Sequence, residues 1–367
     1  RKFFIKKIIA NIRWINKNDN DIINVIFEFN LIDQMKFDKY ILITGGAGFI
    51  GSHLLHKFVI NYEKYFIINV DNLTYASDYT AIKDLESYSN YKFIKGDISD
   101  RTFTQSIFSK YQIDYVIHLA AESHVDNSIE NPLVFVKTNI LGTINLLDQA
   151  RLNWSKDSSD HLFYAISTDE VFGSLDKIGT FNEDSPYQPK SPYSASKASA
   201  DHFIRAYGNT YNLPYIISNC SNNYGPNQHF EKLIPLTISN IIKNKHIPIY
   251  GDGKAIRDWI FVMDHVDAID TIFHHGIVGE TYNVGSNKEI KNIDLVKLIC
   301  SIMDRKLKLK NSELLIKYVQ DRPGHDMRYA INASKIMNEL NWKPKTKFDK
   351  GLEITIDWYI KKLVAKI

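Results

Sequence analysis

Residues 39–59 of this chain, KYILITGGAGFIGSHLLHKFV, decide its fold. An apolar run, a glycine-rich stretch and a helix-forming run follow one another there, which predicts a buried strand, a tight turn and a helix. Gly45, Gly48 and Gly51 form the pattern GxxGxxG at the turn. The first glycine allows the turn, the second lets the backbone approach a pyrophosphate, and the third lets helix and strand pack closely. The stretch therefore predicts a dinucleotide-binding site at a helix N-terminus.

The next two predicted strands end in carboxylates. Asp71 closes the second strand, 20 residues after Gly51, where it can accept hydrogen bonds from both ribose hydroxyls of an adenosine. Because a carboxylate repels a 2′-phosphate, Asp71 favours NAD over NADP as the cofactor. Asp97 ends the third strand and can reach the adenine. Ala120 and Ala121 end the fourth strand, where small residues would line a cofactor trough.

Strands and helices continue to alternate along the chain. We predict helices over 133–151 and 192–211, and strands over 66–71, 92–98, 115–121, 161–173 with its exit loop, and 214–225. Such βαβ units predict an α/β fold with a Rossmann-type, doubly wound parallel sheet. After Gly225 the rhythm loosens. We therefore expect an NAD-binding Rossmann domain over 36–225 and a smaller α/β substrate-binding part over 226–360, some segments of which return to the main sheet.

The composition excludes several classes of protein. Of the 367 residues, 44% are hydrophobic and 24% are charged, which is not the composition of a disordered chain, a collagen or a coiled-coil rod. A net charge of +3 argues against a dedicated nucleic-acid binder. The only cysteines, Cys220 and Cys300, predict reduced thiols and a cytoplasmic protein. No apolar run is long enough for a membrane span, and the scattered histidines contain no HExxH or HxxxH metal motif.

The N-terminal extension, residues 1–34, contains no Gly or Pro. Its isoleucines fall at helical spacing between basic side chains: Ile5, Ile8, Ile9, Ile12 and Ile15. Such a basic amphipathic helix is typical of a membrane-surface or transit segment. Lys6 and Lys7 interrupt any signal-peptide core, however. We expect a dispensable leader, with the catalytic protein effectively starting near Met35.

Tyr193 and Lys197 form the pattern YxxxK at the start of a predicted helix. Residues i and i+4 share one helical face. A lysine ammonium beside a phenol lowers the pKa of the phenol, so that the tyrosinate can act as a base near neutral pH. The lysine can also hold the nicotinamide ribose. YxxxK alone occurs often by chance, but behind the glycine pattern of Thr44–Gly51 it predicts a catalytic tyrosine and lysine.

The segment Ser167–Gly173, STDEVFG, leaves the C-terminal end of the fifth predicted strand. Open α/β sheets bind their ligands at this edge. Asp169 and Glu170 stand next to each other beside the hydroxyl of Thr168. Because neighbouring like charges raise at least one pKa, the pair suits one acid and one base.

The glycine loop, Asp71, Asp97 and the Tyr193/Lys197 pair together resemble the extended short-chain dehydrogenase/reductase family over residues 36–360. The resemblance implies a doubly wound NAD domain and a smaller C-terminal domain that binds a nucleotide sugar. It also implies further cofactor contacts at Phe49, Ile50, Ile98 and Asn223.

Within that family, STDEVFG closely resembles the STDEVYG of nucleoside-diphosphate-glucose 4,6-dehydratases, with Phe172 in place of Tyr. Asn332 is a second departure, where the subfamily often has Asp. Other stretches resemble the same subfamily: LAAESHVD (119–126), NCSNNYGP (219–226), EKLIP (231–235), RDW (257–259) and DRPGHD (321–326).

The resemblance implies that an NDP-glucose loses water to become an NDP-4-keto-6-deoxyglucose. Tyr193 would remove the proton of the 4-hydroxyl while C4 gives a hydride to NAD, and Thr168 would hydrogen-bond the same oxygen. Glu170 would then abstract the C5 proton, and protonated Asp169 would protonate the departing 6-hydroxyl. Return of the hydride to C6 would complete the reaction.

The substrate diphosphate needs cations and amide donors. Arg257 and Arg322 are the best candidates, because a guanidinium binds phosphate bidentately. The resemblance adds Ser123, Asn222, Lys232, Leu233, Pro248, Tyr250, Asn292 and His325. It favours dTDP-glucose as substrate and leaves UDP-glucose open, and it implies a homodimer formed through a helix bundle.

Two alternative functions stay open. An NDP-sugar 4-epimerase would need only Tyr193, Lys197 and NAD, so the Asp169–Glu170 pair argues against it. A non-catalytic NAD-binding sensor would be free to lose Tyr193, Lys197 or the acidic pair, and the chain retains all of them.

Overall fold

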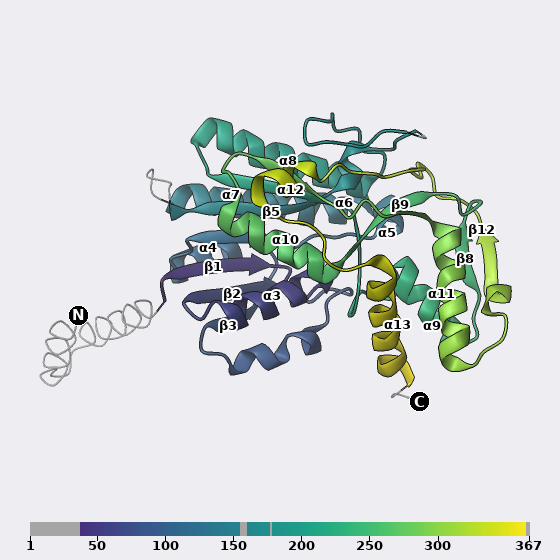
Figure 1. The fold of residues 1–367 in the computed structure, drawn as a ribbon. Helices are drawn as coiled ribbons and strands as arrows, with labels where there is room; N and C mark the ends of the chain where they lie inside the picture. The colour runs from purple at the N-terminus through teal and green to yellow at the C-terminus, as the bar shows by residue number, and fades with distance from the viewer. Residues whose placement is uncertain (1–36, 155–159, 177, 365–367) are drawn as a thin grey trace, which may run out of the picture.

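The computed structural model describes residues 37–154, 160–176 and 178–364 (Figure 1). The amphipathic helix and the leader that we predict over residues 1–34 lie outside these described residues.

A seven-stranded parallel sheet forms the centre of the molecule. Its strand order is β10-β6-β5-β4-β1-β2-β3. The strands are β1 (Lys39–Thr44), β2 (Tyr65–Asp71), β3 (Tyr91–Lys95), β4 (Tyr115–His118), β5 (Leu162–Thr168), β6 (Tyr215–Cys220) and β10 (Thr281–Val284). This order confirms the predicted Rossmann-type sheet. The chain adds β2 and β3 on one side of β1, and it adds β4 and the later strands on the other side. The carboxyl ends of the strands at such a switch point border the ligand crevice.

Helices cover both faces of this sheet. One face packs against α3 (Phe49–Asn61), α10 (Val262–His275) and α12 (Ser334–Leu340). The opposite face packs against α4 (Arg101–Lys110), α7 (Gly142–Asn153) and α8 (Pro192–Tyr211). Ile41 and Leu42, neighbours in β1, belong to opposite cores and are almost fully buried. Both sides of a central parallel strand are apolar for this reason.

A C-terminal part with its own core lies beside the sheet (Figure 1). It holds the helices α9 (Leu233–Ile242), α11 (Asn292–Leu307) and α13 (Phe348–Val364). It also holds a three-stranded sheet of β7 (Asn222–Tyr224), β9 (Ile256–Phe261) and β11 (Glu289–Lys291), and a two-stranded sheet of β8 (Ile247–Tyr250) and β12 (Ile316–Val319).

Short helical segments complete the described chain. They are η1 (Tyr79–Ala81), η2 (Lys83–Ser87), α5 (Val125–Glu130), α6 (Pro132–Phe135), η3 (Val136–Leu141), η5 (Asp169–Phe172) and η6 (Ser312–Leu315).

The segments β10, α10 and α12 follow residue 226 in the chain and still pack within or against the main sheet. The boundary near Gly225 stays a prediction.

The helix predicted over 133–151 is interrupted. Six residues, Val136–Leu141, form a π-helical turn between α6 and α7. Asn139 lies in this turn, and its carbonyl accepts a hydrogen bond from the Thr143 hydroxyl at 2.6 Å. The Asn139 side chain bonds both backbone groups of Glu122 and the hydroxyl of Ser196. These tertiary bonds hold Asn139 inward and explain a local departure from α-helical geometry.

The strand predicted over 214–225 is two strands in different sheets. Ser221 lies between β6 and β7, and its N–H donates to the carbonyl of Val284 at 3.0 Å. β7 then leaves the main sheet and pairs with β9. The chain therefore passes directly from the NAD-binding sheet into the C-terminal part at this point.

Candidate active site

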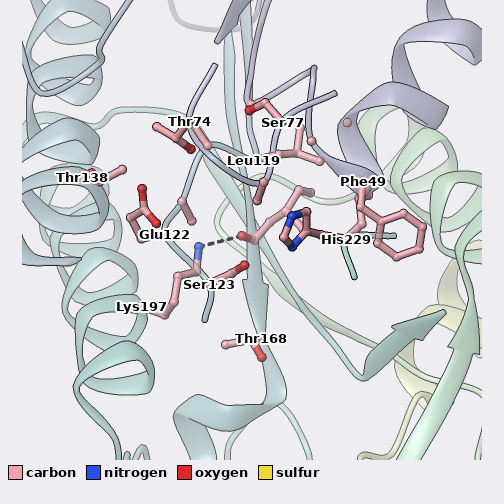
Figure 2. A pocket seen from close by; sticks show the side chains of 18 of the residues that line it. Phe49, Thr74, Ser77, Leu119, Glu122, Ser123, Thr138, Thr168, Lys197 and His229 are labelled. Carbon is pink, nitrogen blue, oxygen red and sulfur yellow. Dashed lines mark hydrogen bonds between the residues drawn. The ribbon is translucent and has the colours of Figure 1, made fainter. Parts of the chain in front are cut away.

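A cavity of about 520 Å³ opens at the carboxyl ends of the central strands. Its walls come from the glycine loop, the ends of β2, β4 and β5, the start of α8 and the loops around β7. Figure 2 shows Thr168, Lys197, Glu122 and His229 around it. The catalytic residues that we predict all line this cavity, as do Ser123, Asn222 and Lys232.

All of the predicted cofactor contacts line the same cavity: Gly45, Gly48, Phe49, Ile50, Gly51, Asp71, Asp97, Ile98, Ala120, Ala121, Tyr193, Lys197 and Asn223. Gly45 has a φ of +76°, and a Cβ there would stand 2.6 Å from the backbone nitrogen of Ala120. Helix α3 begins next to Gly48 without a side-chain cap. Unpaired first-turn N–H groups attract phosphate, so this cradle fits a dinucleotide.

Asp71 is buried and organises the loop around the cofactor cradle. One carboxylate oxygen accepts from the N–H of Ala47 at 2.9 Å, and the other accepts from the N–H of Leu73 at 2.8 Å and the hydroxyl of Ser77 at 2.9 Å. Asp97 similarly accepts from the N–H and the hydroxyl of Ser99. Both carboxylates therefore hold their own turns in addition to facing the cavity.

The acidic pair follows β5 directly. The Thr168 hydroxyl accepts from the N–H of Glu170 at 3.3 Å and so begins the short helix η5. Asp169 is 1% exposed, and its Oδ2 has no hydrogen-bond partner among the described residues. Burial, followed by the nearby charges of Glu170 and Asp258, raises the pKa of Asp169 well above its usual range. These causes favour the protonated form of Asp169, which suits an acid.

Glu170 stands in a different electrostatic environment. Burial raises its pKa, while Arg257, Lys232 and Arg322 act in the opposite direction. Three cations thus favour the carboxylate form of Glu170, which suits a base.

Tyr193 and Lys197 lie in the first turns of α8, where Ser191 and Ser194 form a capping box. The Lys197 ammonium donates to the carbonyl of Ile166 in β5 at 2.8 Å. Burial, then the charge of Glu170, raises the pKa of Tyr193 well above its usual range. A hydrogen bond with the Thr168 hydroxyl acts in the opposite direction. The sequence predicts a lowered phenol pKa; the structure differs because burial dominates and Lys197 points to the strand carbonyl.

Asn223 is held from behind by a buried histidine. Nδ1 of His265 lies 2.9 Å from Oδ1 of Asn223, and the Asn223 amide donates to the carbonyl of Ser221 at 3.0 Å. Burial lowers the pKa of His265 to about 3, so the imidazole is neutral. The same amide lies 3.4 Å from Sγ of Cys220, whose pKa burial raises to about 12. This thiol is therefore not a nucleophile at neutral pH.

Seven predicted substrate residues lie outside the cavity lining: Leu233, Pro248, Tyr250, Arg257, Asn292, Arg322 and His325. The charge of Arg257, on β9, nevertheless lowers the pKa of both Asp169 and Glu170, against the effect of burial. Its guanidinium bonds Nε2 of His325 at 3.1 Å and the carbonyl of Asp326 at 2.9 Å, and it stacks on Tyr329 with 4.3 Å to the ring centre. These contacts join Arg257 and His325 in one rigid group.

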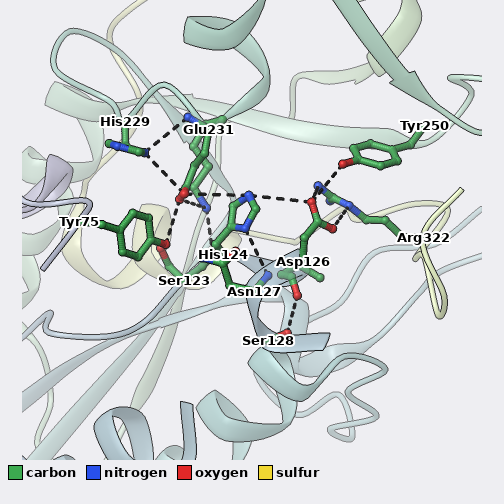
Figure 3. Close-up of polar contacts among 12 residues, drawn as sticks. Tyr75, Ser123, His124, Asp126, Asn127, Ser128, His229, Glu231, Tyr250 and Arg322 are labelled. Carbon is green, nitrogen blue, oxygen red and sulfur yellow. Dashed lines mark hydrogen bonds and ion pairs between the residues drawn. The ribbon is translucent and has the colours of Figure 1, made fainter. Parts of the chain in front are cut away.

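Sequence reasoning missed a polar network across the cavity mouth (Figure 3). Glu231 is its centre: its carboxylate lies 3.5 Å from His229 Nδ1, 3.6 Å from Lys232 Nζ, 4.0 Å from His124 Nε2 and 3.5 Å from the Tyr75 hydroxyl. Although burial raises the pKa of Glu231, His229 and Lys232 bring it below its usual value.

Glu122 faces this network from the loop after β4. Burial, then the charge of Glu231, raises its pKa. Glu122 and Glu231 belong to stretches that the subfamily resemblance covers, so they could have been found there. Tyr75 follows Asp71 in an ordinary loop sequence and carried no such signal.

Two further observations concern the described part of the chain. None of its helices is long and apolar enough to cross a membrane. Within residues 37–154, 160–176 and 178–364, no group of three or more His, Cys, Asp or Glu side chains is placed to hold a metal ion.

Comparison with known proteins gives consistent matches. The family described as GDP-mannose 4,6 dehydratase matches residues 42–355. The dTDP-glucose 4,6-dehydratase of Escherichia coli is 49% identical over 338 residues, covering 87% of this chain and 93% of the relative. A probable dTDP-glucose 4,6-dehydratase of Sinorhizobium fredii is 51% identical over 327 residues, covering 87% and 92%.

Solved structures are similar as well. The dTDP-glucose 4,6-dehydratase of Bacillus anthracis, in complex with NAD, has a TM-score of 0.79 at 43% identity and covers 89% of this chain and 98% of its own. The Streptomyces venezuelae enzyme of the same name, also with NAD, has a TM-score of 0.81 at 38% identity and covers 88% and 97%. A UDP-glucose 4-epimerase from Thermotoga maritima reaches 0.78 at only 29% identity, covering 88% and 99%.

The glycine loop offers a test that separates stability from cofactor binding. In Gly51→Ala, the new Cβ would lie 2.2 Å from the carbonyl oxygen of Gly45, so we expect the free energy of unfolding to fall by about 1–3 kcal/mol. In Gly48→Ala, the nearest atom is 3.2 Å away, so we expect a smaller loss of stability and a clear loss of NAD affinity. Urea unfolding and calorimetric titration with NAD measure the two effects. Equal destabilisation by both changes would contradict this division of roles.

Proposed function

The chain belongs to the dTDP-glucose 4,6-dehydratase family, and we propose that it removes water from dTDP-glucose to give the 4-keto-6-deoxy sugar nucleotide. The observation that carries this proposal is the acidic pair at the end of β5, with Asp169 fully buried and Glu170 facing three cations. An epimerase has no use for this acid and base, because it breaks no bond at C6.

The cofactor of the proposed reaction is NAD. The cradle of Gly45, Gly48 and Gly51 would hold its pyrophosphate, and Asp71 and Asp97 would face its adenosine. When bound, NAD takes the hydride from sugar carbon C4 and gives it back to C6. The chain must supply the proton transfers around these two events.

Tyr193 accepts the proton of the 4-hydroxyl in the proposed reaction. Its pKa is raised by burial, and the hydroxyl of Thr168 is the neighbour that acts against this rise. Thr168 therefore hydrogen-bonds the same oxygen and helps to stabilise the developing charge. Lys197, anchored to the carbonyl of Ile166, sits one helical turn away and positions the cofactor ribose.

Asp169 and Glu170 remove the water. A new 4-ketone acidifies the C5 hydrogen, so Glu170, whose carboxylate form is favoured by the charges of Arg257, Lys232 and Arg322, would take that proton. Asp169, held protonated by burial, gives its proton to the departing 6-hydroxyl. The two adjacent carboxyl groups thus have opposite roles because their environments differ.

The substrate diphosphate would be held by Arg257, Lys232 and Arg322 at the C-terminal side of the cavity. Their charges act on the Glu170 carboxyl, which supports a common location near the acidic pair. Tyr250, His325, Asn222, Ser123, Leu233, Pro248 and Asn292 stay predicted substrate residues. We propose dTDP-glucose ahead of UDP-glucose as the substrate. The relatives that are 49% and 51% identical to this chain are named as dTDP-glucose 4,6-dehydratases.

Product analysis tests this function. We expect NAD-loaded protein in deuterated water to convert dTDP-glucose to a 4-keto-6-deoxy sugar that carries deuterium at C5, because C5 is reprotonated from solvent after elimination. NMR of the product measures this, and UDP-glucose in a parallel reaction tests the nucleotide. A galactose-configured product would instead make the chain an epimerase.

The roles of the acidic pair and of the tyrosine can be separated by substitution. In Glu170→Gln we expect NADH to accumulate at 340 nm while water loss falls at least about 100-fold, because general base catalysis contributes 10²–10⁴-fold. In Tyr193→Phe we expect no NADH, since the first proton transfer fails. Normal turnover of Glu170→Gln would remove Glu170 from the role of base.

We also propose a cytoplasmic homodimer. Cys220 and Cys300 are buried free thiols, which supports a reducing compartment. Exposed apolar side chains on the adjacent elements α6, η3 and α8 support the dimer. Leu133 in α6 is 74% exposed, Val136 and Leu141 in η3 are 45% and 44% exposed, and Phe203 in α8 is 40% exposed. Helical apolar patches of this kind are typical of interfaces.

Sedimentation velocity tests the dimer. We expect the wild type to sediment as a dimer and Leu133→Glu to shift toward monomer, because a buried charge at an interface is costly. Leu314→Glu is the matched control, since Leu314 is 81% exposed in η6 of the C-terminal part. A wild-type monomer, or equal effects of both changes, would contradict the proposed interface.

A further inference from the structure

One carboxylate of the NAD-binding part reaches across to the C-terminal part (Figure 3). Asp126 is the second residue of α5, and Arg322 follows β12. Nε of Arg322 lies 2.6 Å from Oδ1 of Asp126, and Nη2 donates to Oδ2 at 2.9 Å. The hydroxyl of Tyr250, at the end of β8, donates to the same Oδ2 at 3.1 Å.

The orientation of the Arg322 guanidinium is fixed by this arrangement. Its Cζ lies over the ring of Tyr250, 4.3 Å from the ring centre. Its Nη2 donates to Asp126, whereas Nε lies close to the same carboxylate without a hydrogen bond. Nη1 has no hydrogen bond within the described residues, so one edge of the fork stays available for an anion. A guanidinium with one edge fixed and one edge open is preorganised for a phosphate group.

Arg322 does not line the cavity itself, but it lies close to residues that do. The charge of Arg322 acts on both Glu170 and Lys232, which line the cavity. Lys232 is itself tied to the loop of Asp126, because its ammonium donates to the carbonyl of Ser123 at 2.9 Å. The α5 loop thus holds two of the three cations that surround Glu170.

We propose that Asp126 is a positioning residue for the substrate diphosphate, acting through Arg322. Asp126 holds the guanidinium on the ring of Tyr250 and turns its other edge toward the diphosphate. The contact also joins α5 to the C-terminal part. This inference rests on the proposed function, because it assumes a nucleoside diphosphate as the ligand.

Binding of dTDP to the NAD-loaded protein tests the inference by calorimetry. We expect Asp126→Ala and the isosteric Asp126→Asn each to weaken dTDP binding at least about tenfold, since Arg322 is no longer held. In turnover, the KM for dTDP-glucose rises by a similar factor while kcat changes less than about twofold. Glu289→Gln is the matched control: Glu289 pairs Nε of Arg328 at 2.6 Å, an equally close pair at the surface, and its loss should leave dTDP affinity unchanged.

A double-mutant cycle separates positioning from a general structural role. If Asp126 acts through Arg322, the double variant Asp126→Ala/Arg322→Ala binds dTDP no more weakly than Arg322→Ala alone. Unchanged or tighter binding by both Asp126 variants, or additive losses in the cycle, would overturn the inference. Asp126→Asn keeps the side-chain volume, so it serves if Asp126→Ala does not fold.

The proposed function can fail independently of this inference. A wild-type protein that binds dTDP but converts no dTDP-glucose would refute the dehydratase function, while the affinity ratios of the variants would still decide the role of Asp126. A wild-type protein that does not bind dTDP at all would overturn both.

Discussion

The placement of two adjacent carboxyl groups at the end of β5, one fully and one partly buried, is the constraint on which the rest of the site depends. A carboxylate that loses its water must gain cations or hydrogen bonds, or take up a proton. Asp169 has one oxygen without a partner among the described residues, and burial raises its pKa, which favours the protonated form. Glu170 instead faces Arg257, Lys232 and Arg322, all of which come from chain segments after β7. The NAD-binding sheet supplies the acids, and the C-terminal part supplies the charges that set their roles.

Because the acids and the cations come from different parts of the chain, these two parts must keep a fixed relative position. The chain connects them by passing between them repeatedly. It leaves the main sheet at Ser221, pairs β7 with β9, and returns as α10 and β10 before it builds α11. Arg257 and the amide of Asn223 therefore sit on neighbouring strands, one aimed at the acids and one facing the cofactor cradle. The buried imidazole of His265 on α10 fixes Asn223 from the other side. The proposed cofactor residue Asn223 and the proposed substrate residue Arg257 therefore belong to one paired set of strands.

The regular elements could be predicted from the sequence because their causes are local. The apolar run before Gly45 and the glycine spacing specify a strand, a turn and a helix, and the structure has β1 and α3 within a residue or two of the predicted ends. The interruptions could not be predicted, because their causes are tertiary. The π turn at Asn139 depends on Glu122 and Ser196, and the split at Ser221 depends on a carbonyl of β10. The raised pKa of Tyr193 was missed for a similar reason: the spacing of Tyr193 and Lys197 places them on one face but does not reveal how deeply the phenol is buried.

The same reasoning explains why fold alone does not decide the chemistry. The dehydratase and epimerase structures superpose on this chain almost equally well, with TM-scores from 0.78 to 0.81, because the sheet, the glycine turn and the helix with Tyr193 and Lys197 serve any hydride transfer at C4. Elimination at C5 and C6 asks for something more, namely an acid and a base within reach of adjacent carbons. Repulsion between adjacent carboxyl groups on a strand end raises at least one pKa, and the difference between their environments decides which of the two keeps the proton. The turn of η5 buries Asp169 and leaves Glu170 facing Arg257. A single step of the backbone therefore separates the acid from the base.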